Sequence, residues 1–349
     1  MSRCSRVRIK VFRPNRSATV VAGLLLGIFF LLLGRPAHAD TPITLVQSFA
    51  GRLNFAGTEA TLRAAGNNTD ACTVSNSAPA TLSGIPTGAT IKAAYLYWAG
   101  SSTPGYYWII PAVPPDYTVT FENQSITAPA NEQYLVQRTS AYGIGSNVFS
   151  GVADVTSIVQ GRADPNGTYT LSDLTVDTND YTHCAEQTVL AGWALLVIYS
   201  DPGEDFRVVN IYQGFQSFQG SEIVLVPSNF LVPSSPINGK FAHITWEGDR
   251  TNSAPANGFV EALEFDGSSL IDATNPAAEQ FNSKSSAVNP DDQASWGVDF
   301  DVYDVTGYLS SGITSATSTY SSGGDLVLLS AEVLSITNTP VSDLAVTLA

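Results

Sequence analysis

The sequence has few of the side chains from which most enzyme active sites are built. Among its 349 residues are three histidines and three cysteines, and only His183, His243, Cys72 and Cys184 lie beyond residue 39. The G-x-S-x-G, S-x-x-K and H-E-x-x-H motifs are missing, as are phosphate-loop and dinucleotide-binding motifs. Two histidines leave little for a zinc site or a general base. We therefore predict that the protein is not an enzyme.

Basic residues are also scarce beyond the N-terminal region. Seven of the 16 Lys and Arg residues fall within residues 1–39, which leaves nine against 31 acidic residues, a net charge of −22. Nucleic-acid binding needs clustered Lys and Arg to replace phosphate counterions, so nucleic acid is excluded as a partner. Excess carboxylates suit a soluble secreted protein and can recruit divalent cations.

The first 39 residues have the pattern of a secretory signal peptide. Basic residues precede an apolar run at positions 18–34, and A-H-A at positions 37–39 has the form of a cleavage site. We expect cleavage before Asp40, no stable membrane insertion afterwards, and a protein that is secreted or held at the cell surface. The alternative is an uncleaved anchor, because an apolar run of 17 residues approaches the length that spans a bilayer.

Two cysteines remain after cleavage, Cys72 and Cys184. An even number of cysteines in an oxidising compartment favours pairing, so we predict one disulfide between them. Both cysteines fall within residues 41–204, the first of the two related copies described below.

Strand patterns recur along the chain, whereas long helical patterns do not. Residues 91–100 alternate, with Ala94, Leu96 and Trp98 on one face and Ala93 on the other. Residues 191–199 form a nearly continuous apolar run, which is typical of a strand buried on both faces. The sequence is therefore predicted to be all-β.

Five segments recur in the same order in the two halves of the chain. For example, KAAYLYWAG at 92–100 matches KFAHITWEG at 240–248, and VADVTSIV at 152–159 matches VYDVTGYL at 302–309. The matches predict two tandem diverged β-sandwich units of jelly-roll-like form after a cleaved signal peptide. The predicted parts are a signal peptide (1–39), a first copy (41–204), a second copy (205–338) and a C-terminal tail (339–349).

The alignment of the two copies also predicts the roles of matched residues. Trp98 should superpose on Trp246, each as a core anchor of its sandwich. Asp154 should superpose on Asp304, and each should cap the short helical turn that follows it.

The second copy carries acidic residues that the first copy lacks. Glu247, Asp249, Asp299 and Asp301 stand where the alignment gives the first copy Ala99, Ser101, Phe149 and Gly151. Carboxylates at i and i+2 project to one side of an extended strand, so these four could converge. Together with Asp325 they are candidate ligands for Ca²⁺. The alternative is that they are spread over solvated loops.

A second candidate site is the loop that holds Tyr106, Tyr107 and Trp108. Glycine and proline bound this loop, so its rings could stack on a sugar or on a partner surface. The alternative is that the loop packs over its own sandwich.

Several segments taken together carry a family resemblance. The order AAYLYWAG, GVADVTSIV, YTLSDLTV, AGWALLVIYSDP, RVVNIYQGF, GVDFDVYDVTGYL resembles a region near the N-terminus of large secreted bacterial surface proteins. There the region precedes Ig-like conserved-repeat modules and forms a domain family of unknown function. The resemblance implies a role in surface architecture or adhesion and supplies no catalytic residue. The D-V-T element is also similar to jelly-roll modules of the galactose-binding-like kind, which favours carbohydrate binding only at the level of fold.

The leading hypothesis is a secreted, non-enzymatic surface or extracellular-matrix protein that contacts glycans or other proteins. One alternative is a glycan-active hydrolase, which would need two carboxyl groups roughly 5–10 Å apart. No acidic pair stands out by its spacing. The other alternative is a purely structural component of the cell envelope.

Overall fold

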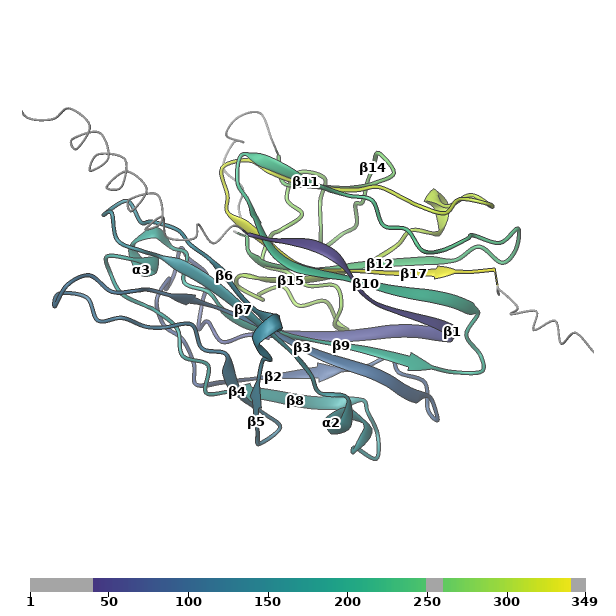
Figure 1. Ribbon diagram of the computed structural model, residues 1–349, viewed down its shortest axis with the longest axis horizontal. Coiled ribbons are helices and arrows are strands. Elements are labelled where there is room, and N and C mark those ends of the chain that lie inside the picture. Colours follow the sequence, from purple (N-terminus) through teal and green to yellow (C-terminus); the bar gives the residue numbers. More distant parts are fainter. Residues whose placement is uncertain (1–39, 249–259, 340–349) are drawn as a thin grey trace, which may run out of the picture. The chain divides into compact units, whose positions relative to one another are not determined.

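The computed structural model describes residues 40–248 and 260–339, and it confirms the all-β prediction (Figure 1). The predicted signal peptide and residues 340–349 of the predicted tail lie outside the described residues. The helices described are single turns: η1 (Ala130–Glu132), α2 (Thr156–Gln160), α3 (His183–Glu186) and η3 (Thr306–Tyr308). The strands are β1 (Thr41–Thr61), β2 (Ser77–Leu82), β3 (Thr90–Ser102), β4 (Thr118–Phe121), β5 (Gln124–Thr127), β6 (Gln133–Val136), β7 (Asn147–Asp154), β8 (Gly167–Ser172), β9 (Ala191–Ser200), β10 (Phe206–Phe218), β11 (Ser221–Leu225), β12 (Gly239–Glu247), β13 (Ala262–Phe265), β14 (Ser268–Ser269), β15 (Val298–Asp304), β16 (Ser318–Ser322) and β17 (Val327–Thr337).

The long first strand connects two groups of strands in one nine-stranded sheet. Its order is β15-β12-β17-β10-β1-β9-β3-β7-β6. Residues Thr41 to Arg52 of β1 pair with β10, and residues Leu53 to Thr61 pair with β9, all antiparallel. The two groups pack face to face, since one core cluster draws buried side chains from β3, β9, β10, β12, β15 and β17.

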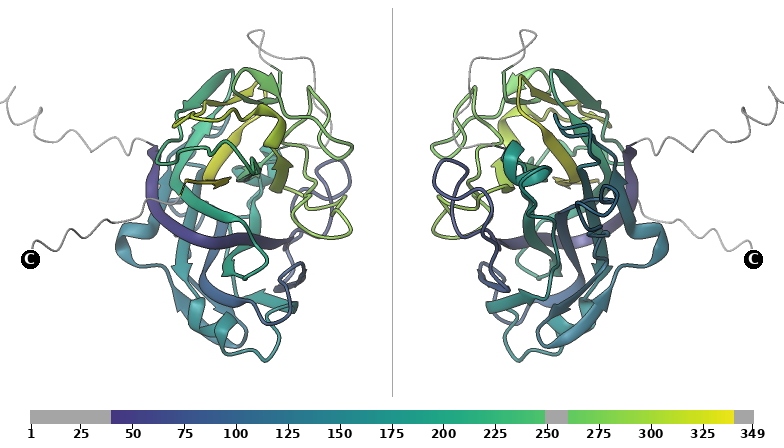
Figure 2. Two further views of the ribbon diagram at one scale, coloured as in Figure 1. Left: turned by 90° about the vertical axis from the view of Figure 1, so that its right-hand side faces the viewer. Right: turned by 90° about the vertical axis from the view of Figure 1, so that its left-hand side faces the viewer.

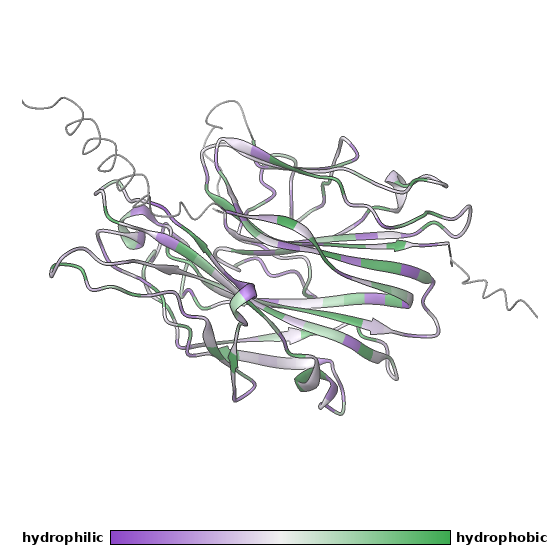
Figure 3. Cartoon of the chain, in the orientation of Figure 1, coloured by the Kyte–Doolittle hydropathy of each residue, from purple (hydrophilic) through white to green (hydrophobic). Residues whose placement is uncertain are grey.

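Each group also packs its other face against a small sheet, so the strands form four layers (Figure 2). The sheet β2-β8-β4-β5 covers the first group, and β11-β16-β13-β14 covers the second. We call the three resulting cores the first, central and second cores. Central strands of the large sheet are therefore buried on both faces, and hydrophobic segments run along β3, β9 and β10 (Figure 3).

The sequence pattern of β9 and β3 follows from this layering. Every residue from 191 to 199 is buried, as the continuous apolar run predicts. On β3, Ala94, Leu96 and Trp98 belong to the first core, while Ala93 belongs to the central core. The predicted alternation is correct, and both faces of this strand are covered.

Close packing in the central core depends on a glycine of β1. A Cβ atom built on Gly57 would lie 2.3 Å from the ring of Phe300 in β15. Real Cβ atoms do not approach so closely, so only glycine lets the two strand groups come into contact here. The packing of the central core therefore requires a glycine at position 57 as well as the apolar side chains around it.

Both predicted aspartate caps are confirmed. Asp154 Oδ1 accepts a hydrogen bond from the N–H of Thr156 at 2.8 Å, and Asp304 Oδ1 accepts one from Thr306 at 2.9 Å. In each case the bonded N–H belongs to the first residue of the helical turn, α2 or η3. The recurrence supports the tandem duplication, which stays a prediction together with its boundaries at 41–204 and 205–338.

The predicted superposition of the two tryptophans is wrong. The threonines after the two aspartates accept hydrogen bonds from the N–H groups of Ala94 and Gly239, which makes these two residues equivalent. Counting four residues onward along each strand makes Trp98 equivalent to His243. Trp98 lies in the first core and Trp246 in the central core. The sequence alignment was shifted by three residues, and an odd shift moves a strand residue to the opposite face.

Candidate functional site

The loop after β3 projects three aromatic side chains into solvent. The side chains of Tyr106, Tyr107 and Trp108 are 43%, 78% and 91% exposed. The loop has its own backbone structure, since the Tyr106 N–H donates to the carbonyl of Ile110 at 2.9 Å. Gly105 has a φ of +77°, and a Cβ there would lie 2.7 Å from the same carbonyl oxygen, so the turn requires glycine. The loop does not bury its rings on its own sandwich.

Two further tyrosines, missed by the sequence analysis, are exposed on other loops, one of which is hydrogen-bonded to this loop's start. Tyr142 and Tyr181 are 60% and 52% exposed, and their rings meet edge to face with centroids 5.7 Å apart. The loop of Tyr142 is held to the loop after β3 by Thr103, whose Oγ1 donates to the carbonyl of Gly145 at 2.7 Å. We call Tyr106, Tyr107, Trp108, Tyr142 and Tyr181 the aromatic tip; its loops lie near α3 in Figure 1.

The predicted disulfide is confirmed and fixes the loop that carries Tyr181. Cys72 and Cys184 are bonded, with their Cα atoms 5.3 Å apart. His183, next in the chain, is 1% exposed, and its ring nitrogens lie 3.0 Å from the carbonyl of Thr188 and 3.2 Å from that of Ser102. Burial lowers the pKa of His183. This histidine therefore ties α3 to the end of β3 and is not positioned as a base.

The predicted acidic site is divided between different environments. Asp299 and Asp301 are fully buried on β15, whereas Glu247 ends β12 with its Oε2 accepting the N–H of Gly248 at 3.0 Å. Asp325 precedes β17, and Asp249 lies outside the described residues. Within residues 40–248 and 260–339, no three of the predicted ligands bring carboxylate oxygens within 4.8 Å of one another.

One described group does meet that distance, Cys72, Asp180 and Cys184. Its two sulfur atoms form the disulfide, and a metal ligand must be a thiolate. This group is therefore not a metal site.

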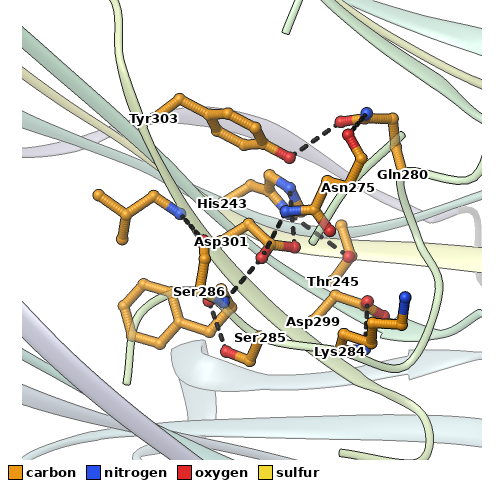
Figure 4. Close-up of polar contacts among 12 residues, drawn as sticks. His243, Thr245, Asn275, Gln280, Lys284, Ser285, Ser286, Asp299, Asp301 and Tyr303 are labelled. Carbon is orange, nitrogen blue, oxygen red and sulfur yellow. Dashed lines mark hydrogen bonds and ion pairs between the residues drawn. The ribbon is translucent and has the colours of Figure 1, made fainter. Parts of the chain in front are cut away.

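The second core contains a buried polar cluster around His243 (Figure 4). His243 Nε2 lies 3.7 Å from Asp301 Oδ2, and its Nδ1 lies 3.4 Å from Thr245 Oγ1. Burial lowers the pKa of His243 to about 3 and raises the pKa of Asp301 to about 7. The order Thr-His-Asp is that of a nucleophile, base and orienting acid. All three residues are fully buried, however, so no substrate reaches them in this conformation.

A buried glutamate on β17 belongs to the same core. Glu332 is fully buried, and its Oε2 accepts hydrogen bonds from Ser318 Oγ at 2.5 Å and Tyr320 Oη at 2.8 Å. Burial raises the pKa of Glu332 to about 7, although these two hydrogen bonds act in the opposite direction. Glu332 is the one charged residue of β17, which was the signal available in the sequence.

The equivalent positions in the first core are apolar. Trp98 pairs with Trp193 and Gly151, whereas its equivalent His243 pairs with Glu332 and Asp301. Both cores contain aromatic rings, but at these equivalent positions the second core has ionisable side chains where the first has tryptophan and glycine.

A surface hollow of about 320 Å³ lies beside Lys240. The Lys240 ammonium donates to the carbonyl of Phe55 at 2.7 Å and lies 4.1 Å from the centre of that ring. Burial lowers the pKa of Lys240 to about 8, with the nearby Glu204 opposing the shift. The amine is thus held by contacts within the fold.

Comparisons with known proteins identify the family to which the chain belongs and nothing more specific. No curated protein and no solved structure matches the chain. Within the described residues, no helix has the length and apolarity needed to cross a membrane. The family model described as "protein of unknown function (DUF3344)" matches residues 37–337, so the chain belongs to that family.

Proposed function

We propose that this protein is a secreted, non-enzymatic surface or extracellular-matrix protein that contacts glycans or other proteins. The aromatic tip carries the proposal. Tyrosine and tryptophan combine a flat apolar face with a polar group, and they are enriched in binding interfaces. Trp108 is 91% exposed, and its recorded ring contact is with Tyr107 of the same loop, with centroids 6.2 Å apart, so the ring is not held against the sandwich.

The contacts that hold the loops of the aromatic tip in place favour a binding role. The disulfide, the buried His183 and the Thr103–Gly145 hydrogen bond hold the loops before any ligand arrives. A preformed site loses less conformational entropy on binding than a flexible one does. The disulfide also favours an exported protein, because such bonds persist in oxidising compartments.

The non-enzymatic part of the proposal rests on the buried polar cluster. Among the described residues, His243 and Asp301 are the one histidine and carboxylate with side-chain N and O atoms within 4.0 Å, and both are closed off from solvent. By analogy with the bacterial surface proteins that the sequence resembles, we propose a place beside Ig-like modules and a role in adhesion.

The test is binding of the purified protein to a glycan array and to envelope fractions. We expect Tyr107→Ala combined with Trp108→Ala to weaken binding at least about tenfold, as for truncated interface anchors. The matched control is Val224→Ala combined with Val226→Ala, which removes exposed apolar side chains (52% and 64%) from another surface. An unchanged affinity of the Tyr107/Trp108 variant would contradict the proposal.

The same experiment separates the two alternatives. Release of cleaved sugar would indicate a glycan-active hydrolase. Retention of the tagged protein in the envelope without any bound ligand would indicate a purely structural component.

A further inference from the structure

The segment from residue 274 to 286 wraps the carboxylates of β15. Asp299 Oδ1 accepts the N–H of Asn282 at 2.9 Å and that of Lys284 at 3.3 Å. Asp301 Oδ1 accepts the N–H of Ser286 at 3.0 Å and the amide Nδ2 of Asn275 at 2.9 Å. One oxygen of each carboxylate is therefore fully used in holding this segment.

The remaining oxygens of the same side chains have no hydrogen-bond partner. Asp299 Oδ2, Asp301 Oδ2 and the amide oxygens of Asn275 and Asn282 are all buried and unpartnered. The four residues are fully buried. Their amide nitrogens, in contrast, are satisfied: that of Asn282 donates to the carbonyls of Thr274 and Glu279. Every unsatisfied atom in this group is thus an acceptor.

The nearest donor on the sheet does not satisfy them. His243 Nε2 lies 3.7 Å from Asp301 Oδ2, which is too long for a hydrogen bond. A buried acceptor without a partner destabilises the fold, and an unpaired ionised carboxylate does so more strongly. The four atoms belong to β15 and to the segment that is hydrogen-bonded to its two aspartates, so a single bound group could serve as partner for several of them.

We propose that these four side chains form a binding site for a hard divalent cation, Ca²⁺ in particular. We call the set the β15 oxygen cluster: Asp299, Asp301, Asn275 and Asn282. Ca²⁺ binds carboxylate and amide oxygens and accepts irregular coordination, which suits two carboxylates on a strand and two amides on a wrapping segment. Asp299 and Asp301 are two residues apart on β15, so their side chains leave the same face of the strand.

A further carboxylate on β1 adds negative charge near the cluster. Glu59 is 2% exposed, and neither of its oxygens has a hydrogen-bond partner. Burial raises the pKa of Glu59, and the charges of Asp292 and then Asp301 raise it further. Burial also raises the pKa of Asp299, with Asp301 the next cause and Glu59 a smaller one. No third carboxylate joins the two aspartates within 4.8 Å among the described residues, so Glu59 acts through its charge rather than as a ligand.

The proposed site differs from the one expected from the sequence. It keeps Asp299 and Asp301 but takes its other ligands from the wrapping segment instead of Glu247 and Asp325. The first half has no counterpart, because Gly151 occupies the position equivalent to Asp301. We therefore expect one cation per chain.

The test is calcium titration of the purified, EDTA-treated protein by calorimetry, together with its melting temperature. We expect 1:1 binding and a higher melting temperature with Ca²⁺, since a ligand of the folded state stabilises it. Asp299→Asn combined with Asp301→Asn keeps the side-chain shapes and should weaken binding at least about 100-fold. The control Glu222→Gln removes an exposed carboxylate of β11 and should leave binding unchanged.

The other possible results of this experiment also test the proposed calcium site. If the aspartate variant fails to fold, Asn275→Asp supplies a second test, because an added carboxylate should tighten binding. Unchanged affinity in either variant, or no effect of millimolar Ca²⁺ on the melting temperature, would overturn the site. The latter result would mean that protons or buried water satisfy these oxygens.

Discussion

Replacing Glu332 with glutamine isolates the effect of one buried charge on stability. Glutamine has nearly the same shape, and its amide oxygen can still accept the hydrogen bonds of Ser318 and Tyr320. The substitution thus removes the titratable carboxyl group but keeps the side-chain shape and the accepted hydrogen bonds. It therefore tests whether burial holds this group in its protonated form.

The expected size follows from the pKa of Glu332, which burial raises from 4.5 to about 7. One pKa unit corresponds to about 1.4 kcal/mol, so the shift amounts to about 3 kcal/mol. The folded pKa lies above the unfolded one, so this stabilisation is fully present below pH 4.5. It is lost as the pH rises to about 7, because the unfolded chain releases the proton first.

The assay is urea unfolding of both proteins in EDTA, at several pH values between 4.5 and 7.5. The stability of the wild-type protein should fall more steeply over this range, by about 3 kcal/mol relative to Glu332→Gln. Asp301 titrates in both proteins and so contributes a shared background. Parallel stability curves for the two proteins would refute the reasoning and would mean that Glu332 is already ionised in the folded state.

Three other predictions follow from the fold. Cys72→Ser opens a disulfide that closes 112 residues and should lower stability by roughly 4–5 kcal/mol in urea unfolding, whereas an effect below about 1 kcal/mol would show that the loop is held by other contacts. Gly57→Ala places a methyl group against Phe300 and should cost about 1–3 kcal/mol, while Gly307→Ala, with nothing within 4 Å of its Cβ, should cost much less. N-terminal sequencing of the secreted protein should begin at Asp40, and an intact N-terminal segment in the membrane fraction would contradict cleavage.

Local pattern was enough to predict much of the fold. The apolar run at 191–199 predicted β9, and the alternation at 91–100 predicted β3. Both predictions were possible because a buried strand face requires apolar residues at regular positions in the sequence. The D-V-T turns and the disulfide followed from equally local chemistry. For the loop of Trp108 the sequence left exposure and packing on the sandwich both open, and the structure shows exposure.

The relation between the two halves could not be read in the same way. Matching letters aligned Trp98 with Trp246, yet hydrogen bonding shows that Trp98 is equivalent to His243. In a sheet that is buried on both faces, a shift of three residues still places an apolar residue against a core. The apolar pattern therefore fits both registers of the alignment, and it did not reveal that the chosen one places Trp246 on the opposite face from Trp98.

Only two of the four residues in the β15 oxygen cluster could be identified from the sequence, and the reason is different. Asp299 and Asp301 stand out in a strand, because charge there breaks an apolar pattern. Asn275 and Asn282 lie in an irregular segment, where asparagine is common and its partners depend on distant parts of the chain. Only the folded segment brings their amides to β15.

The shared first strand has a mechanical consequence. β1 and β17 run in the same direction on either side of β10, since both pair with it antiparallel. A pulling force applied at Thr41 and Thr337 would draw β1 and β17 in opposite directions along their own axes. The backbone hydrogen bonds on both sides of β10 would then share the load and break together, rather than opening one after another from an end. The fold therefore resists extension between Thr41 and Thr337 more strongly than a sheet whose strands are peeled apart one hydrogen bond at a time.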